Sequence, residues 1–307
     1  MKMRDEMREA WLENRFNLEK TRRKRQRNRG ILPRHWTLFR RLIILFGYLL
    51  KLIGCYNRGV KNALNIRIRE YEAGFSDLPE AFDGYRILHL TDLHLNIIDG
   101  LDDIISRKIA GIHVDLCVLT GDYRKETDGE FRQVIGPMKK IIRSIQATDG
   151  IVATLGNHDT YLMVKPLSKA GITVLTNESV KLSRGPDEIL VTGVDDVYYY
   201  YSPAAEQCLE NMDASFKIAL VHSPALYDVA AANGYQLYLC GHTHGGQICL
   251  PGGIPVITHV SRGKKYFRGW WQVDKMKGYT STGAGTSGIP VRFYSESEIT
   301  LITLRKE

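Results

Sequence analysis

Five apolar runs of this 307-residue chain each end in side chains that can ligate a metal ion. The side chains are carboxylates, imidazoles and one amide, and they stand in Asp92-Leu93-His94, Gly121-Asp122, Asn157-His158-Asp159, His222 and His242-Thr243-His244. Mixed nitrogen and oxygen ligands of this kind suit divalent Mn, Fe, Zn or Co. Because five of the nine histidines occupy these positions, the pattern predicts a metal centre. The other four, His35, His89, His113 and His259, show no such placement and are predicted to be structural.

Each of these short motifs has an ordinary structural explanation when it is taken alone. An Asp-x-His pair is common, a Gly-Asp after a strand is usually a turn, and a histidine after an apolar strand is often a satisfied core group. Local geometry nevertheless favours ligation, since alternation places Asp92 and His94 on the same side of an extended segment. The glycines beside Asp122, Asn157 and His242 permit sharp turns that direct the next side chain back towards the same place.

The segments that carry these residues are predicted to form alternating strands and helices. Strands are predicted over Arg86–Thr91, Asp115–Thr120, Ile151–Leu155, Phe216–Val221 and Gln236–Cys240, and helices over Asp102–Ile112 and Phe131–Ile145. After Gly252 the pattern predicts mostly antiparallel strands, such as Tyr266–Val273 and Glu298–Leu304. The predicted class is mixed α/β. Open α/β sheets bind ligands at the carboxyl ends of strands, so the five strand ends are expected to form one rim.

The ordered series of motifs resembles the calcineurin-like metallophosphoesterase superfamily over residues 83–305. The resemblance implies a four-layer α/β/β/α sandwich that carries two divalent metal ions. One ion would be held by Asp92, His94 and His244, and the other by Asn157, His222 and His242, with Asp122 bridging both. His158 would remain unligated beside the substrate phosphate.

The implied chemistry is hydrolysis of a phosphoester or a phosphoanhydride. Two such ions lower the pKa of a water molecule and neutralise phosphoryl oxygens during in-line displacement. His158 is expected to donate a hydrogen bond to the leaving or equatorial oxygen, and Asp159 to orient His158.

A narrower resemblance concerns the substrate. The string Gly241–Gln247 followed by Pro251, together with Gly193–Asp196 and Pro290–Phe293, is similar to a membrane-associated bacterial branch of the superfamily. Some members of that branch hydrolyse UDP-2,3-diacylglucosamine in lipid A synthesis, which makes a lipid-linked substrate the first expectation. A phosphodiesterase of soluble nucleotides is the alternative. The third hypothesis is a non-catalytic scaffold. Loss of metal-ligating residues would favour this hypothesis, but all of the expected ligands are present in the sequence.

Three residues are candidate substrate contacts. Gln247 lies beside the histidine motif, and the planar guanidinium of Arg292 suits a phosphate, although a surface ion pair explains Arg292 equally well. Tyr199 belongs to a run of four tyrosines, residues 198–201, that could stack on a base or line a lipid groove. Packing on alternate faces of a sheet is the other explanation of that run.

The positive net charge of +8 is confined to the N-terminus. Residues 1–61 hold 17 Lys and Arg against 5 Asp and Glu, whereas the remaining 246 residues hold 25 against 29. This shift divides the chain into a basic extension, residues 1–61, and a catalytic domain, residues 62–307. A nucleic-acid partner is not expected, because the basic run lacks interleaved aromatics and the domain has no excess of positive charge. The five dispersed cysteines do not form a disulfide framework.

Within the extension, residues 36–54 predict a helix that lies on a membrane. Only nine uncharged residues separate Arg41 from Lys51, fewer than the ~20 that a spanning helix needs. An interfacial helix with basic neighbours would hold the protein peripherally on anionic lipid at the cytoplasmic face of the membrane. Two alternatives remain open. The helix could dock on the protein's own domain, or residues 40–44 and Cys55 could belong to a twin-arginine or lipoprotein export signal.

Overall fold

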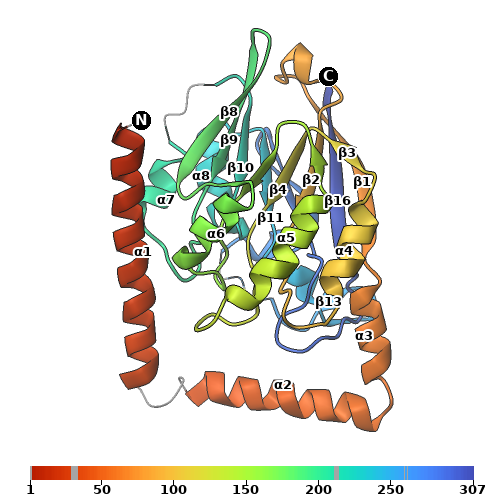
Figure 1. Cartoon of the computed structure of the whole chain (residues 1–307). Helices are drawn as coiled ribbons and strands as arrows, with labels where there is room; N and C mark the ends of the chain where they lie inside the picture. The colour runs from red at the N-terminus through yellow and green to blue at the C-terminus, as the bar shows by residue number, and fades with distance from the viewer. Residues whose placement is uncertain (1, 29–33, 211–213, 259, 261) are drawn as a thin grey trace.

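The computed structural model of the protein describes residues 2–28, 34–210, 214–258, 260 and 262–307 and contains two six-stranded sheets (Figure 1). The strands of the first sheet are, in spatial order, β1 (Arg67–Phe75), β16 (Glu298–Lys306), β2 (Arg86–Leu90), β4 (Leu116–Leu119), β6 (Ile151–Ala153) and β7 (Ile172–Val174). Those of the second are β14 (Gly269–Val273), β15 (Met276–Thr280), β11 (Leu237–Cys240), β10 (Lys217–Leu220), β9 (Asp187–Gly193) and β8 (Glu178–Arg184). Two small pairs join β12 (Cys249–Leu250) to β13 (Ile254–Pro255) and β3 (His113–Val114) to β5 (Gln146–Ala147).

Eight α-helices occur among the described residues. They are α1 (Lys2–Asn28), α2 (Arg34–Leu52), α3 (Tyr56–Leu64), α4 (Leu101–Ile109), α5 (Ile135–Ser144), α6 (Val164–Lys169), α7 (Pro203–Gln207) and α8 (Tyr227–Ala232). Short 3-10 turns are formed by Glu80–Phe82, Arg132–Val134, Tyr161–Met163, Pro224–Leu226, His244–Gly246 and Lys264–Tyr266. The predicted helix over 131–145 thus begins as a 3-10 turn. Pro137 then stands in the first turn of α5, where its missing N–H is not needed.

Three apolar cores separate four layers, which confirms the predicted α/β/β/α sandwich. Ile87 of β2 and Ile218 of β10 belong to the core between the two sheets. Leu88, the next residue, lies in the core that packs against α4 and α5, because successive strand side chains point to opposite faces. A third core covers the outer face of the second sheet beneath α8.

The pairing of strands differs in part from the prediction for the C-terminal region. As expected, β14 pairs with β15 and β16 with β2 in antiparallel fashion. However, β15 also pairs in parallel with β11, and β16 in parallel with β1, so the two strands continue sheets begun earlier in the chain. The strands that carry the candidate ligands are likewise divided, with β2, β4 and β6 in one sheet and β10 and β11 in the other.

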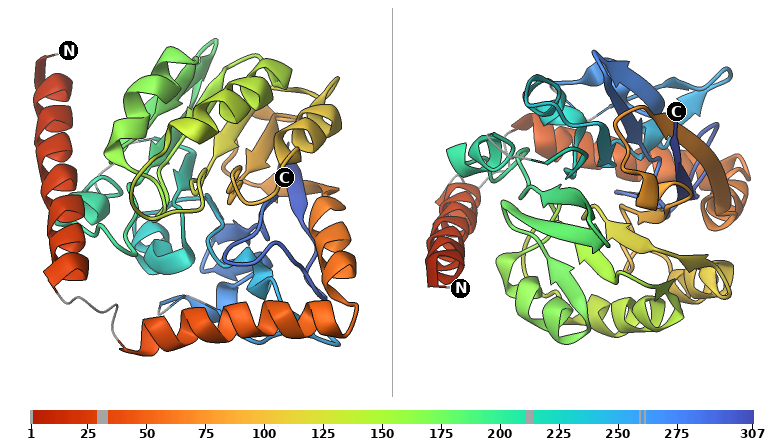
Figure 2. Two further views of the ribbon diagram at one scale, coloured as in Figure 1. Left: turned by 60° about the horizontal axis from the view of Figure 1, so that its bottom comes forward. Right: turned by 90° about the horizontal axis from the view of Figure 1, so that it is seen from above.

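The three N-terminal helices run around three sides of the domain, with α1 and α3 upright and α2 across the base (Figures 1 and 2). Helix α2 packs through a stripe at helical spacing, formed by Ile43, Phe46, Gly47 and Leu50. No single helix among the described residues is long and apolar enough to cross a membrane. Arg41–Leu52 and Tyr56–Leu64 reach that length only together, across a bend of 105°.

Candidate metal centre

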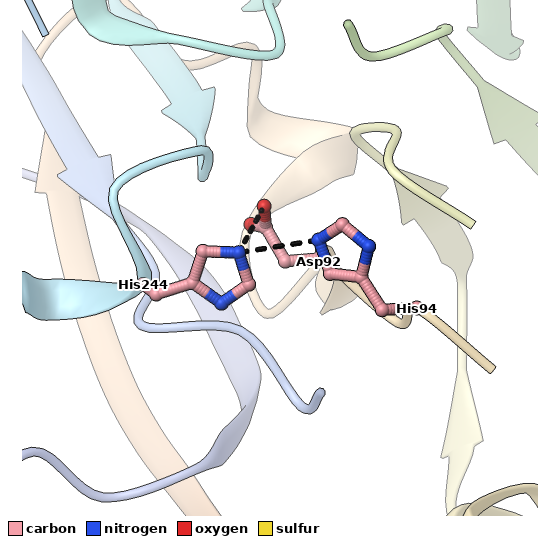
Figure 3. A group of neighbouring side chains, drawn as sticks. All are labelled: Asp92, His94 and His244. Carbon is pink, nitrogen blue, oxygen red and sulfur yellow. Dashed lines mark hydrogen bonds and ion pairs between the residues drawn. The ribbon is translucent and has the colours of Figure 1, made fainter. Parts of the chain in front are cut away.

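The carboxyl ends of the five strands meet where the two sheets come together, and they bring the candidate ligands into two clusters. Asp92, His94 and His244 form the first (Figure 3). Nε2 of His244 lies 3.4 Å from Oδ1 of Asp92 and 3.2 Å from Nε2 of His94. One atom from each side chain therefore faces a common point, although the chain separates His94 from His244 by 150 residues.

The second cluster is formed by Asp122, His222 and His242. Nε2 of His222 lies 3.3 Å from Oδ2 of Asp122 and 3.2 Å from Nδ1 of His242. The amide oxygen of Asn157 is 3.1 Å from the same Nε2. Asp122 Oδ2 also lies 3.6 Å from Nε2 of His94, so this carboxylate stands between the two clusters.

Hydrogen bonds outside the clusters fix the protons of two imidazoles. Nδ1 of His94 is 2.7 Å from the carbonyl oxygen of Arg124, and Nδ1 of His222 is 2.7 Å from that of Thr120. Since a carbonyl can only accept, each Nδ1 carries a proton, and in the neutral ring of His94 Nε2 turns a lone pair to the cluster. At His222 burial lowers the pKa, but the carboxylate of Asp122 outweighs burial and raises the pKa to about 10. Nε2 of His222 therefore has to release a proton before it can bind a metal. Oδ1 of Asp92 is buried and has no hydrogen-bond partner among the described residues. A buried carboxylate oxygen among unprotonated nitrogens fits a cation, so these residues suit a divalent metal.

Burial and mutual charge set the protonation states. Burial lowers the pKa of His94 to about 3 and that of His244 well below its ordinary value, so both rings are neutral, the form in which an imidazole can bind a metal. Burial also raises the pKa of Asp92 to about 6. Burial would also raise the pKa of Asp122. The charge of His222 and the other neighbouring imidazoles outweighs this effect and holds the pKa of Asp122 well below its ordinary value. Asp122 is therefore ionised between the clusters.

The backbone at these positions is conformationally unusual. Nine non-glycine residues of the described chain have a positive φ, and five of them are candidate ligands: Asp92, His94, Asp122, His242 and His244. Such conformations are costly and persist where the surroundings enforce them, often at functional sites. Close approach adds to the constraint, because a Cβ on Gly156 would overlap Oδ1 of Asp122 and one on Gly241 would overlap Oδ2 of Asp92. Glycine is required at both positions.

His158 stands at the open side of the centre. Its side chain is 19% exposed, and its Nε2 lies 3.9 Å from Oδ2 of Asp122. Its main-chain N–H donates to Oδ1 of Asp122, and its Nδ1 is hydrogen-bonded to the carbonyl oxygen of Lys125. His158 could also act as a ligand, since it groups with His94 and Asp122.

Asp159 differs from its predicted role as the residue that orients His158. Its carboxylate accepts hydrogen bonds from the main-chain N–H groups of Asp122 (2.8 Å), Tyr123 (3.0 Å) and Gly156 (2.8 Å). The chain turns at residues 156–159, which points Asp159 back beneath the loop and away from the ring of His158. Asp159 therefore joins two ligand-bearing loops, while a carbonyl oxygen orients the His158 ring.

Arg292 and Gln247 also require correction as predicted substrate contacts. Arg292 is fully buried, and its guanidinium donates to the carbonyl oxygens of Thr282 (2.6 Å), Gly285 (2.7 Å) and His244 (3.0 Å). Gln247 is almost buried, and its amide bonds to the main chain of residues 287 and 289. Both side chains hold the loops around His244, because the surrounding carbonyl groups need donors in a space without solvent.

The tyrosine run, residues 198–201, lies beside the second cluster, and we call it the tyrosine wall. The ring of Tyr198 is 4.6 Å from that of His242, and Tyr199 packs next to it at 4.8 Å. The guanidinium of Arg22, from α1, covers the ring of Tyr199 at 3.8 Å. Tyr199, the predicted contact, is therefore half covered by the N-terminal helix.

Sequence reasoning missed the contribution of α1 to the site. Trp11 and Arg15 both bond to the carboxylate of Asp195, and Arg15 also reaches the carbonyl oxygen of Asp159 at 3.0 Å. Glu19 accepts from the hydroxyl of Thr160 at 2.7 Å and from the N–H of Tyr161 at 2.9 Å. Residues 11, 15, 19 and 22 lie on one face of the helix, a spacing that could have indicated a docked helix.

Among the histidines predicted to be structural, His89 is buried and hydrogen-bonded to Oγ1 of Thr120 at 2.8 Å. His113 is exposed at the start of the short β3–β5 pair. His259 and the side chain of His35 lie outside the described residues.

Comparison with known proteins identifies the arrangement. A family model described as calcineurin-like phosphoesterase matches residues 85–246, more than half of the chain. The chain belongs to this family. It is 32% identical over 251 residues, 78% of its length and 86% of the relative's, to a Bacillus subtilis protein named "Uncharacterized metallophosphoesterase YkuE". It is 29% identical over 264 residues to a Danio rerio "Transmembrane protein with metallophosphoesterase domain", covering 78% of this chain and 57% of that one.

A solved structure of a 5'-nucleotidase precursor from Thermus thermophilus aligns with 71% of this phosphoesterase and 54% of its own chain, at 13% identity and a TM-score of 0.42. The family assignment makes the protein a hydrolase of phosphorylated substrates that uses divalent metal. The residues present fit that chemistry. The two clusters offer imidazole nitrogens and the ionised carboxylate of Asp122 to a divalent ion, and the partly exposed side chain of His158 lies beside them.

Proposed function

We propose that this phosphoesterase binds two divalent ions, of Mn, Fe, Zn or Co type, and hydrolyses a phosphoester or pyrophosphate bond. The position of Asp122 carries the proposal. Oδ2 of Asp122 lies within 3.6 Å of an imidazole Nε2 from each cluster, so one carboxylate can serve both ions. Asp92, His94 and His244 would hold one ion, and Asn157, His222 and His242 the other. Metals held in this way supply a nucleophile at neutral pH and neutralise phosphoryl charge.

His158 is proposed as the catalytic hydrogen-bond donor to the substrate. The carbonyl oxygen of Lys125 accepts from its Nδ1–H, and Nε2 of the partly exposed side chain lies 3.9 Å from Oδ2 of Asp122. An imidazole in this place donates to a phosphoryl or leaving oxygen when Nε2 is protonated. Arg124 supports the loop, because its Nε donates to the carbonyl oxygen of His158 at 2.6 Å.

The substrate that we propose first is a phosphorylated molecule carried in a membrane, such as UDP-2,3-diacylglucosamine, met at the cytoplasmic face. Two observations support this location. Helix α2 leaves Leu45 and Leu52 63% and 85% exposed, and basic residues surround it. The printed name of the Danio rerio relative also places a metallophosphoesterase domain in a membrane protein. Retention of α1 is expected, because removal of residues 1–54 as an export signal would break the buried contacts of Arg15 and Glu19.

A phosphodiesterase of soluble nucleotides is the second candidate, and the tyrosine wall favours it. Tyr198 extends an aromatic surface from His242 at the second cluster, and such a surface suits stacking of a planar base. In this case α2 would only hold the protein at the membrane and would take no part in substrate binding.

The test is a substrate screen with the purified full chain. Protein with Mn²⁺ is assayed against UDP-2,3-diacylglucosamine, bis-p-nitrophenyl phosphate and cyclic nucleotides, with Asp122→Asn as the inactive control. Preference for the lipid substrate supports the first candidate, preference for cyclic nucleotides the second, and no hydrolysis of any would contradict both. Deletion of residues 1–61 does not separate the candidates, because α1 is packed against the loops of Asp159 and Asp195.

A further inference from the structure

Exposed apolar side chains concentrate on one part of the surface. Of the seventeen large hydrophobic residues that are exposed among the described residues, seven lie in residues 42–53 and five in residues 250–257 and Tyr294. We call these two segments with Tyr294 the apolar face. Ile254, Val256 and Tyr294 are 61%, 56% and 62% exposed. Concentration on this scale is unusual in a monomeric soluble protein and indicates an interaction surface.

One loop, residues 287–289, connects the two halves of the apolar face. Ile289 lies 3.9 Å from the position of a Cβ on Gly47 of α2, and Ile43 lies 3.8 Å from that on Gly288. Gln247 then bonds to the carbonyl oxygen of Ile289 at 3.0 Å, which ties this loop to the start of the 250–257 segment. Figures 1 and 2 accordingly show the β12–β13 region next to α2. Helix α2 and the 250–257 segment are thus both held to the 287–289 loop of the catalytic domain.

The two segments of the apolar face, with their flanking residues, carry charge of a single sign, although Arg262 among them is paired with Asp228. Residues 34–64 contain six Lys and Arg and no Asp or Glu. Residues 244–273 contain four Lys and Arg and again no acid, although residues 62–307 as a whole are net acidic. Arg41 and Lys51 are exposed on α2, and the guanidinium of Arg268 lies against Gly253. The surroundings of the face are therefore complementary to an anionic surface.

We propose that the apolar face, including residues 250–257 and Tyr294 of the catalytic domain, is a docking surface for a bilayer that contains anionic phospholipid. A second copy of the chain fits the face less well, because a symmetric contact would bring its flanking cations together. Apolar side chains would enter the acyl boundary while the cations remain at the headgroups.

This surface also determines how the metal centre meets the membrane. Leu250 follows the candidate ligand His244 by six residues, and Arg292, two residues before Tyr294, donates to the carbonyl oxygen of His244. The two loops of the catalytic domain that reach the face are thus held to the first metal cluster. The functional part of this inference rests on the proposed function: a bilayer docked on the apolar face would bring a lipid-linked phosphate near the candidate metal centre. Bilayer binding itself needs neither substrate nor turnover.

The first experiment measures vesicle binding of the full chain by cosedimentation. Vesicles of phosphatidylcholine alone are compared with vesicles that contain 30% phosphatidylglycerol. The test variant is Ile254→Ser/Val256→Ser/Ile257→Ser, and the matched control is Leu162→Ser/Tyr201→Ser, which removes exposed apolar groups of residues outside the apolar face. The triple variant is expected to weaken partitioning by about 100-fold or more, since each of the three lost side chains forfeits about a kcal/mol of apolar burial. The control variant should change it less than 2-fold.

The second experiment asks whether both halves touch lipid at once. An environment-sensitive fluorophore is attached to Leu45→Cys, Val256→Cys or, on the distant β8 strand, Ser183→Cys, each in a Cys55→Ser background. A blue shift with anionic vesicles at positions 45 and 256, and none at 183, is expected. A shift at 45 alone would limit docking to α2 and overturn the proposal. Absence of vesicle binding together with dimers that the triple variant abolishes would assign the face to a second copy. Hydrolysis of bis-p-nitrophenyl phosphate, measured in parallel, reports separately on the proposed function.

Discussion

Arg15 of helix α1 donates a hydrogen bond of 3.0 Å to the main-chain oxygen of Asp159, although 144 positions separate the two residues. The carboxylate of Asp159 in turn accepts from the N–H groups of Asp122 and Gly156, which lie on two ligand-bearing loops. The N-terminal helix is therefore connected to the candidate metal centre through a single intermediate residue. The basic extension is, in this part, a component of the catalytic unit.

Replacing Arg15 should reveal how strongly α1 supports the fold. The guanidinium is buried against Asp195, and Arg15→Met would leave that buried carboxylate without its charge partner. We expect the free energy of unfolding to fall by about 3–5 kcal/mol in urea titrations, as is usual when one member of a buried ion pair is removed. Glu13→Gln, an exposed change on the same helix, should alter it by less than about 0.5 kcal/mol. Equal stability of the two variants would mean that α1 is not docked in solution.

Asp122→Asn should be the most damaging single change in the centre. The substitution removes the negative charge between both clusters while keeping the size of the side chain. We expect metal content, measured by plasma mass spectrometry, to fall towards zero and hydrolysis to fall by several orders of magnitude. A variant that retains two metals per chain and normal turnover would contradict the bridging role.

His158→Asn should separate catalysis from metal binding. Because His158 is proposed as a donor to substrate, its loss should lower kcat by about 10²–10³, as loss of one transition-state donor does. Metal content should remain that of the parent protein. A parallel collapse of metal stoichiometry would instead make His158 a ligand, which its grouping with His94 and Asp122 allows.

The sequence predicted that the candidate ligands would come together, because their positions follow local rules. Asp92, Asp122 and His222 each stand two or three residues after the end of a short buried strand, and alternation and glycine turns are visible in the chain itself. The division of these strands between two sheets could not be predicted from the local pattern, because it depends on pairing between strands that are far apart in the sequence.

The roles of Arg292 and Arg15 could not be read in the same way. A lone arginine in a polar loop looks exposed in sequence, and only the tertiary structure surrounds Arg292 with carbonyl oxygens from residues 244, 282 and 285. Arg15 lies in a helix of strongly polar composition, which predicts exposure, yet its partners come from two distant loops. Side chains that bond to main chain leave no pattern of their own in the sequence.

Burial of His89 should make the protein less stable in acid. Burial lowers the pKa of His89 to about 3, against an ordinary value of 6.5, so the folded protein keeps the ring neutral. Between these values the unfolded chain binds one proton more than the folded one, and stability falls as the pH falls below 6.5. From pH 7.5 to pH 5 this group alone should cost about 2 kcal/mol. His89→Gln removes the titrating ring, so its free energy of unfolding, measured in chelator at both pH values, should fall by about 2 kcal/mol less than that of the parent. His113→Gln, at an exposed position, should behave like the parent, and an unchanged pH dependence in His89→Gln would show that the buried ring does not govern acid sensitivity.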